Sequence, residues 1–354
     1  MPVLTPSFCP PQFLGNGHLQ TILPVLLPRR ISLSSTRTRL ELADGDFLDL
    51  DWTRAGHGRL AIISHGLEGN SAQTYVRGMA ATLHAARWDV VAWNFRGCSG
   101  EPNRLLRAYH SGDTADLAAV IAHAAADYPQ IALIGFSLGG NVTLKYVGEA
   151  PPHPAIVAAA AISVPLDLAS SARALDQRPG NRIYLRRFIV PLVAKIEAKA
   201  DAFPGQLNIQ GIRAIRSFQE FDRRYTAPMH GFRDAEDYWI RASARQFLPR
   251  IKVPTLILNA RNDPFLTTDS LPFPEAEANP SLFLEAPTSG GHVGFLDFAI
   301  GLQPWSERRV SEFIERSEKT SPMVNHQRSV GDADEHQEIR DGETSDRHPA
   351  AGQR

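Results

Sequence analysis

The stretch that most constrains the fold is a sharp turn between an apolar run and a helical pattern. Residues 131–134 are expected to form a buried strand, the Gly-Phe-Ser-Leu-Gly of residues 135–139 follows, and a helical pattern runs from 141 to 147. This is the strand–turn–helix setting of a G-x-S-x-G nucleophile elbow, in which a strained turn lifts the hydroxyl of Ser137 clear of the sheet. Because glycine makes up roughly 7% of residues, the bare pattern occurs by chance in about one chain of this length in ten. The rest of the chain must therefore support it.

Expected strands alternate with helical patterns on both sides of this turn. The first two flank an Asp-Gly-Asp turn and predict an antiparallel hairpin, because their apolar residues alternate. The eight expected strands lie at about residues 40–42, 47–52, 59–64, 90–94, 131–134, 156–164, 255–259 and 281–284. A hairpin followed by such alternation predicts an α/β fold with a mostly parallel eight-stranded sheet and helices on both faces.

The domain organisation is predicted from breaks in this rhythm. Residues 166–240 have helical patterns and no convincing strand, so we interpret them as a helical cap inserted between the two parts of the core, 31–165 and 241–318. Residues 1–30 are rich in proline and are expected to form an irregular N-terminal arm. Residues 319–354 have almost no large apolar side chains and are predicted to be a disordered tail.

Composition limits the partners that the chain can have. Hydrophobic residues make up 43% of its 354 residues and the formal net charge is −1, so nothing favours nucleic acid or bulk attraction to a membrane. Contact with a membrane surface remains possible. Cys9 and Cys98 form neither a metal spacing nor a disulfide framework. Without an evident signal peptide or a transmembrane stretch, we expect a cytoplasmic protein.

An acid and a base follow the serine along the chain. Asp263 comes just after the expected strand at 255–259, at the carboxyl end where ligands bind in open parallel sheets. His292 follows the last expected strand, in the glycine-flanked loop of residues 289–295. A serine hydroxyl becomes a good nucleophile when a base takes its proton and a third group orients that base. The sequence thus supplies all three groups.

These residues predict an ester-cleaving mechanism. Ser137 would attack the ester carbonyl, His292 would accept its proton and return it to the leaving alcohol, and Asp263 would fix and stabilise the imidazole. The oxyanion needs two backbone donors, which we expect to be the N–H groups of Leu67 and Leu138.

Each assignment has a structural alternative. Ser137 could be only a helix cap, and Asp263 could only cap the turn before Pro264, in which case Asp269 is the reserve acid. His292 could be a histidine of an ordinary surface loop.

Other polar residues have less direct roles. We expect His65 to orient its loop by hydrogen bonding, while His110 precedes the nucleophile and so comes in the wrong order for the base. Four residues could line an anion pocket or form a buried support: Arg96, Arg107, Tyr109 and Asp113. The apolar face of residues 183–196, with a kink expected at Pro191, could bind an acyl chain or simply pack the cap. No cluster has metal-ligand spacing, so no metal or cofactor is expected.

Several stretches together resemble the YheT-like family of α/β-hydrolases. They are residues 17–22, 65–69, 94–100, 109–114, 135–141, 225–228 with 231–232, and 263–265 with 291–295. The resemblance covers residues 16 to about 315. It implies an α/β-hydrolase fold, a triad of Ser137, Asp263 and His292, and carboxylesterase or lipase-like activity without a cofactor.

The leading hypothesis is a serine carboxylesterase that acts on small, uncharged short- to medium-chain acyl esters. An alcohol acyltransferase or a thioesterase would use the same acyl-enzyme on Ser137. A third hypothesis is a non-catalytic binding scaffold with a hydrolase-like fold. A serine at the elbow argues against epoxide hydrolases and dehalogenases, because those enzymes need a carboxylate nucleophile.

Overall fold

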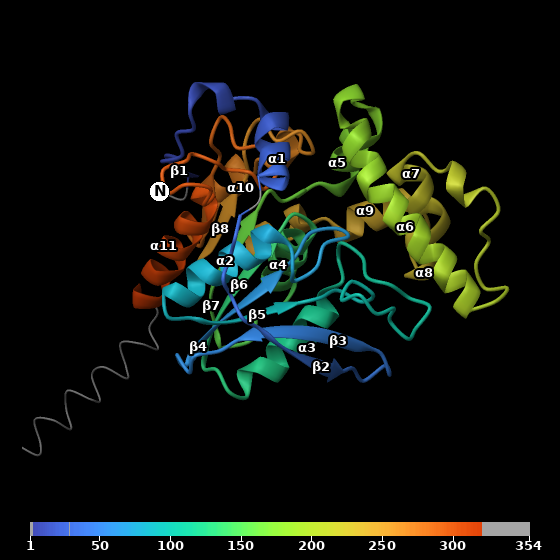
Figure 1. Ribbon diagram of the computed structural model, residues 1–354, viewed down its shortest axis with the longest axis horizontal. Helices are drawn as coiled ribbons and strands as arrows, with labels where there is room; N and C mark the ends of the chain where they lie inside the picture. The colour runs from blue at the N-terminus through green and yellow to red at the C-terminus, as the bar shows by residue number, and fades with distance from the viewer. Residues whose placement is uncertain (1–2, 28, 321–354) are drawn as a thin grey trace, which may run out of the picture.

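The computed structural model describes residues 3–27 and 29–320 of the chain (Figure 1). The tail predicted to be disordered, residues 319–354, lies outside the described residues from 321 onward. Its first two residues complete the last helix, α11 (Trp305–Thr320).

The described residues form one mostly parallel nine-stranded sheet in the order β1-β9-β8-β7-β6-β4-β5-β3-β2. The strands are β1 (Val3–Leu4), β2 (Thr36–Glu41), β3 (Phe47–Thr53), β4 (Arg59–Ser64), β5 (Asp89–Trp93), β6 (Gln130–Phe136), β7 (Ile156–Ile162), β8 (Thr255–Leu258) and β9 (Leu282–Glu285). Among these strands the antiparallel pairs are β2–β3 and β3–β5. The sheet has one strand more than the sequence predicts. The extra strand is β1, which pairs with β9 and is too short to show a periodicity.

The N-terminal arm is more regular than expected. It contains a short 3₁₀ turn (Gln12–Leu14) and the helix α1 (Gly17–Leu26). The side chain of Asn16 caps α1 by accepting hydrogen bonds from the N–H groups of the second and third helical residues. Pro24 lies inside this helix and disguises it in the sequence.

Helices cover both faces of the sheet, which is why its central strands are apolar on both sides. The helices of the core are α2 (Thr74–Ala85), α3 (Thr114–Ala125), α4 (Leu138–Glu149), α10 (Phe273–Ala278) and α11. Ile62 and Leu133 pack in the apolar cluster that includes residues of α3 and α4. Their neighbours Ile63 and Ile134 pack in the cluster that includes residues of α2 and α11. This two-residue alternation buries side chains on both faces of the sheet. Because β4 to β9 pair in parallel, their carboxyl ends lie at one edge of the sheet, between the two layers of helices.

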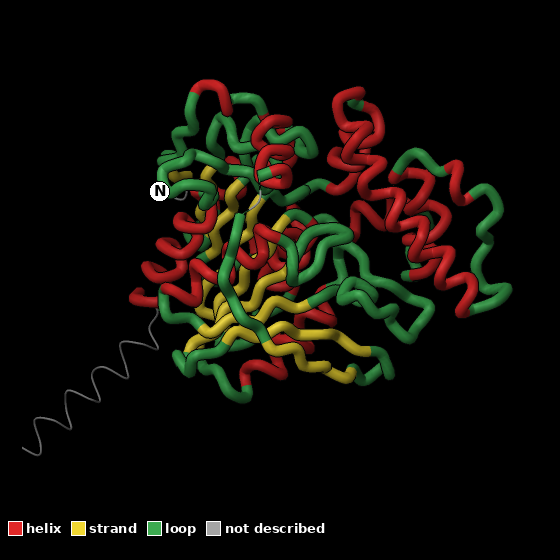
Figure 2. Tube along the Cα trace, in the orientation of Figure 1, coloured by secondary structure: helices red, strands yellow, loops and turns green. Residues whose placement is uncertain are grey.

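The segment expected to form the cap is helical and stands to one side of the strands (Figure 2). It contains α5 (Leu168–Gln177), a 3₁₀ turn (Pro179–Asn181), α6 (Arg182–Ala202), a second 3₁₀ turn (Ile212–Ala214), α7 (Phe218–Phe221), a π-helical turn (Asp222–Thr226), α8 (Ala227–Met229) and α9 (Ala235–Ala242). Residues 166–242 are all described and hold no strand. They have their own apolar cluster, and α6 continues through Pro191 as one helix. Two further 3₁₀ turns, Ala244–Arg250 and Thr268–Ser270, belong to the second part of the core, residues 241–318.

Candidate active site

Ser137 lies between β6 and α4 in a backbone conformation that only a tightly constrained turn sustains. Its φ is 51° and its ψ is −117°. A Cβ atom on Gly135 would lie 2.4 Å from the carbonyl oxygen of Gly139. A Cβ atom on Gly139 would lie 2.4 Å from the carbonyl oxygens of Ser64 and His65. The two glycines of the pattern are therefore required by close backbone contact.

The structure brings Ser137, His292 and Asp263 into one hydrogen-bonded chain. His292 Nε2 lies 3.0 Å from Ser137 Oγ, and His292 Nδ1 lies 2.8 Å from Asp263 Oδ2. The Asp263 side chain is fully buried, and its other oxygen accepts a hydrogen bond of 2.9 Å from the N–H of Phe265. A neutral imidazole with its proton on Nδ1 would donate to the carboxylate and leave Nε2 to accept from the serine. The reserve acid, Asp269, is exposed and makes no hydrogen bond to Ser137, His292 or Asp263.

The loop that carries His292 is held by side chains from three separate segments. The N–H groups of residues 291–293 donate to Asn262 Oδ1, Thr21 Oγ1 and Ser163 Oγ at 3.1, 2.9 and 2.9 Å, respectively. The histidine ring packs on Phe265, with 4.1 Å between ring centroids. None of these four partners has a role that is predicted from the sequence. Thr21 belongs to the stretch 17–22, which is part of the family resemblance and is the one sequence signal that could have pointed to it.

Leu67 and Leu138 line the same cavity as Ser137. Leu138 is the first residue of α4, so its N–H has no partner within the helix. Neither of the two N–H groups donates to another described residue. A Cβ atom on Gly66, the residue before Leu67, would come 3.4 Å from the Cβ of Ser137, so the two loops approach closely. The arrangement suits two free donors aimed at one oxygen.

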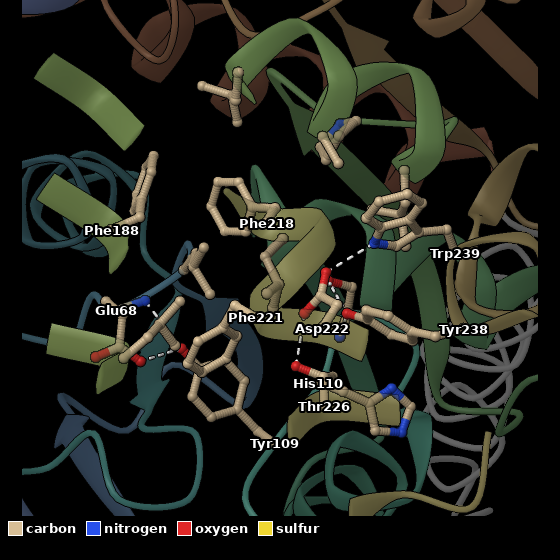
Figure 3. A pocket seen from close by; sticks show the side chains of 18 of the residues that line it. Glu68, Tyr109, His110, Phe188, Phe218, Phe221, Asp222, Thr226, Tyr238 and Trp239 are labelled. Carbon is tan, nitrogen blue, oxygen red and sulfur yellow. Dashed lines mark hydrogen bonds between the residues drawn. The ribbon is translucent and has the colours of Figure 1, made fainter. Parts of the chain in front are cut away.

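Glu68 fixes the loop that carries Leu67 by bonding to Tyr109 (Figure 3), and it links this loop to the cap through Lys195. It has a φ of 53°, which is unfavourable for a side chain of this type. Its N–H donates to the Tyr109 hydroxyl at 3.0 Å, and that hydroxyl donates back to the Glu68 carboxylate at 2.7 Å. Lys195 of α6 reaches the same carboxylate oxygen at 2.9 Å. Sequence reasoning missed this link because its partners are up to 127 residues apart.

His65 and His110 are not positioned as the base. His65 is fully buried, and burial lowers its pKa to about 4. It is therefore neutral, with its proton on Nδ1 donated to the Gly66 carbonyl at 2.7 Å and Nε2 accepting from the N–H of Phe95. This matches the loop-orienting role expected for it. His110 lies in the cavity wall, where its Nδ1 accepts from the N–H of Gly112 and burial lowers its pKa to about 3.

The two arginines considered for an anion pocket are already paired. Arg96 makes a bidentate ion pair with Asp116 at 2.8 and 2.7 Å and also contacts Asp46 at 3.0 Å. Arg107 pairs with Asp113 at 2.6 Å. Arg96 is therefore a buried structural support, while Arg107 is partly exposed and has its charge paired with a carboxylate of the chain itself.

A largely apolar cavity of about 1100 Å³, part of it open to solvent, lies between the cap and the core above Ser137 and His292. Its apolar lining includes Leu168, Leu175, Phe188, Leu192, Phe218, Phe221, Met229, Phe265 and Leu266. Asp222 is an acid in this wall that has no charged partner among the described residues (Figure 3). Asp222 accepts from the Thr226 hydroxyl at 2.6 Å and from Trp239 Nε1 at 2.8 Å, and burial raises its pKa to about 6.

A cluster that spacing does not reveal lies apart from the cavity lining. His57, His84 and Asp89 each bring one ligand atom within 4.8 Å of the others. The Asp89 carboxylate already accepts from the N–H of Ala55 at 2.7 Å and from the Tyr128 hydroxyl at 2.9 Å. Because these bonds occupy the acid, the cluster gives no reason to revise the expectation for metals.

Comparison with known proteins adds a family match. A family model described as the alpha/beta hydrolase fold matches residues 62–299. YheT of Escherichia coli (strain K12), which is named as an esterase, is 36% identical over 87% of this chain and 93% of its own. Phospholipase ABHD3 of Mus musculus is 28% identical over 92% of this chain and 80% of its own. The structure of the Pyrococcus furiosus esterase Pf2001 is 18% identical, covers 81% of this chain and 92% of its own, and superposes with a TM-score of 0.56.

Proposed function

Because the chain belongs to the α/β-hydrolase family, we propose that it is a serine carboxylesterase that hydrolyses short- to medium-chain acyl esters through an acyl-enzyme on Ser137. The general class, an ester-hydrolysing enzyme, agrees with the names of its relatives, an esterase and a phospholipase. The observation that carries the proposal is the hydrogen-bonded chain from Ser137 to Asp263 at the floor of an apolar cavity.

The proposed reaction has two halves. The Ser137 oxygen attacks the ester carbonyl carbon while His292 Nε2, 3.0 Å away, takes the hydroxyl proton and then delivers it to the leaving alcohol. Water then attacks the acyl-enzyme with the same base, and Ser137 leaves with a proton. Asp263 keeps the imidazole in the required tautomer and stabilises its charged form. Leu67 and Leu138 are the proposed backbone donors to the oxyanion.

The lining of the cavity favours a substrate whose acyl group is uncharged. Most of the cavity lining that the cap contributes is aliphatic or aromatic, and the charged side chains of the lining are those of Glu68, Lys195, Lys199 and Asp222. Burying an apolar chain against such a wall is favourable at roughly 0.8 kcal/mol per methylene, whereas a charged acyl group would have to lose its hydration. Acyl-chain length is therefore expected to be selected in this cavity.

The test is a series of p-nitrophenyl esters from acetate to palmitate, with labelling by a fluorophosphonate probe. We expect the butyrate and octanoate esters to be cleaved best, and Ser137→Ala to lose labelling and lower kcat by on the order of 10⁴-fold or more. The matched control is Ser171→Ala, because Ser171 also lines the cavity and its hydroxyl has no hydrogen-bond partner among the described residues. Labelling that persists in Ser137→Ala would refute the proposed nucleophile.

A cytoplasmic location is part of the proposal. Its support is the cysteine chemistry: Cys9 is an exposed free thiol and Cys98 is a buried one. In the described part of the chain, no helix is both long and apolar enough to cross a bilayer.

A further inference from the structure

Helix α6 has two faces with different surroundings. Five of its residues line the cavity: Phe188, Leu192, Lys195, Ile196 and Lys199. Five residues in the first half of the helix are exposed on the outside of the cap, and we call them the outer face of α6: Arg182, Ile183, Arg186, Arg187 and Val190. The exposed residues further along α6 are Ala194, Ala198, Asp201 and Ala202. At about 100° per residue, the exposed five fall within an arc of roughly 140° on the side opposite to the cavity. The apolar cluster of the cap explains the inner face but not the outer one.

The outer face of α6 is both apolar and basic. Ile183 and Val190 are 66% and 58% exposed and lie at the middle of the arc. Arg182 and Arg186 flank them on one side and Arg187 on the other. None of the three arginines makes a hydrogen bond or an ion pair with another described residue.

The positive charge of this face is local. The whole chain has a formal net charge of −1, with 37 basic and 38 acidic residues. The first half of α6, residues 182–192, however, contains three arginines and no aspartate or glutamate. Such a concentration on one part of a helix attracts an anionic surface even though the protein as a whole does not.

We propose that the outer face of α6 docks the protein on anionic lipid membranes. A central apolar stripe with long cationic side chains at its margins is the pattern of a helix that lies in a bilayer interface. Ile183 and Val190 would enter the acyl boundary while the arginine stems lie along the surface and their guanidinium groups reach lipid phosphates. Three unpaired cations favour lipid over a second copy of this chain, because two such faces would repel each other. The cavity lies against the opposite face of the same helix.

The test is sedimentation of the full chain with vesicles of phosphatidylcholine alone or mixed with phosphatidylglycerol. We expect binding to the anionic vesicles and weak binding to phosphatidylcholine. One variant carries Arg182→Gln, Arg186→Gln and Arg187→Gln. Since each surface cation contributes about 1 kcal/mol, or about fivefold, this variant should bind on the order of 100-fold more weakly. A second variant, Ile183→Asp with Val190→Asp, should not sediment.

Matched variants keep the test specific. Arg30→Gln, Arg54→Gln and Arg250→Gln together remove the same charge from exposed arginines outside α6, and Ile300→Asp changes an apolar residue that is also 58% exposed. Both should bind like the wild type. Hydrolysis of a water-soluble ester should be equal in all variants, which shows that they are folded and separates this inference from the proposed activity.

Three results would overturn the inference. They are no binding of wild type to anionic vesicles, binding that the α6 variants do not change, and size-exclusion chromatography showing a dimer that dissociates in those variants.

Discussion

Asp222 is a buried carboxyl group with no cationic partner among the described residues. Its two oxygens accept hydrogen bonds from the neutral groups of Thr226 and Trp239. Burial raises its pKa from 3.8 to about 6, because nothing compensates for the hydration that the charged form loses. In the folded protein this acid therefore keeps its proton at pH values where the unfolded chain has released it.

We predict that Asp222→Asn becomes more stable relative to wild type as the pH rises. A raised folded-state pKa gives stability that is present below pH 3.8 and is lost as the pH rises through about 6. The asparagine does not titrate, and it can keep both bonds if its oxygen accepts from Trp239 and its amide donates to Thr226. The advantage should approach at most roughly 3 kcal/mol at neutral pH. Denaturant unfolding of both proteins at pH 4.5 and 7.5 measures it, and a difference that is the same at both pH values would contradict the prediction.

At the scale of elements, the loop between β4 and α2 depends on one tyrosine. The Tyr109 hydroxyl both accepts from the N–H of Glu68 and donates to its side chain, which holds the positive φ of Glu68. The neighbouring N–H of Leu67 is therefore aimed by Tyr109, which lies 41 positions after Glu68 along the chain. Such aiming matters because an oxyanion donor works only within hydrogen-bonding distance of the developing charge.

We predict that Tyr109→Phe lowers kcat for a soluble ester by on the order of tenfold to a hundredfold with little change in KM. The donor at Leu67 is misplaced in the transition state, whereas the apolar cavity that binds substrate is kept. The control is Tyr128→Phe. Tyr128 is as buried as Tyr109, at 7% exposure, and its hydroxyl bonds to Asp89, which does not line the cavity. If both variants lower kcat alike, the loss reflects general destabilisation.

Some strands and helices can be predicted from the sequence, and others cannot. The central strands and the elbow are predictable because their apolar runs and glycines are local signals, and their order identifies the fold. The strand β1 is missed because two residues carry no periodicity, and α1 because Pro24 obscures its pattern. The order of Ser137, Asp263 and His292 along the chain allows their selection. The supporting residues Glu68 and Thr21 cannot be found in this way, because tertiary contacts alone bring them to the site.

At the scale of the whole molecule, the N-terminal arm closes the structure around the histidine loop. Gln20 is fully buried and bonds to both the N–H and the carbonyl of Leu296, at 2.9 Å each. A Cβ atom on Gly17 would lie 1.9 Å from the carbonyl oxygen of Asn262, so the arm also touches the segment that carries Asp263. The acid and the base are thus held by a segment more than 240 residues away in sequence.

We therefore predict that Thr21→Val lowers kcat by on the order of tenfold, although Thr21 touches no reacting atom. The valine keeps the volume but removes the oxygen that accepts from the N–H of His292 at 2.9 Å, so the imidazole is held less precisely. The rate of fluorophosphonate labelling should fall in parallel, because the probe needs the same base. The control is Thr53→Val at the end of β3, which removes a hydroxyl that donates to the Ser34 carbonyl. Each change should cost about 1 kcal/mol in stability. Equal labelling rates in the two variants would mean that the arm stabilises the fold without positioning His292.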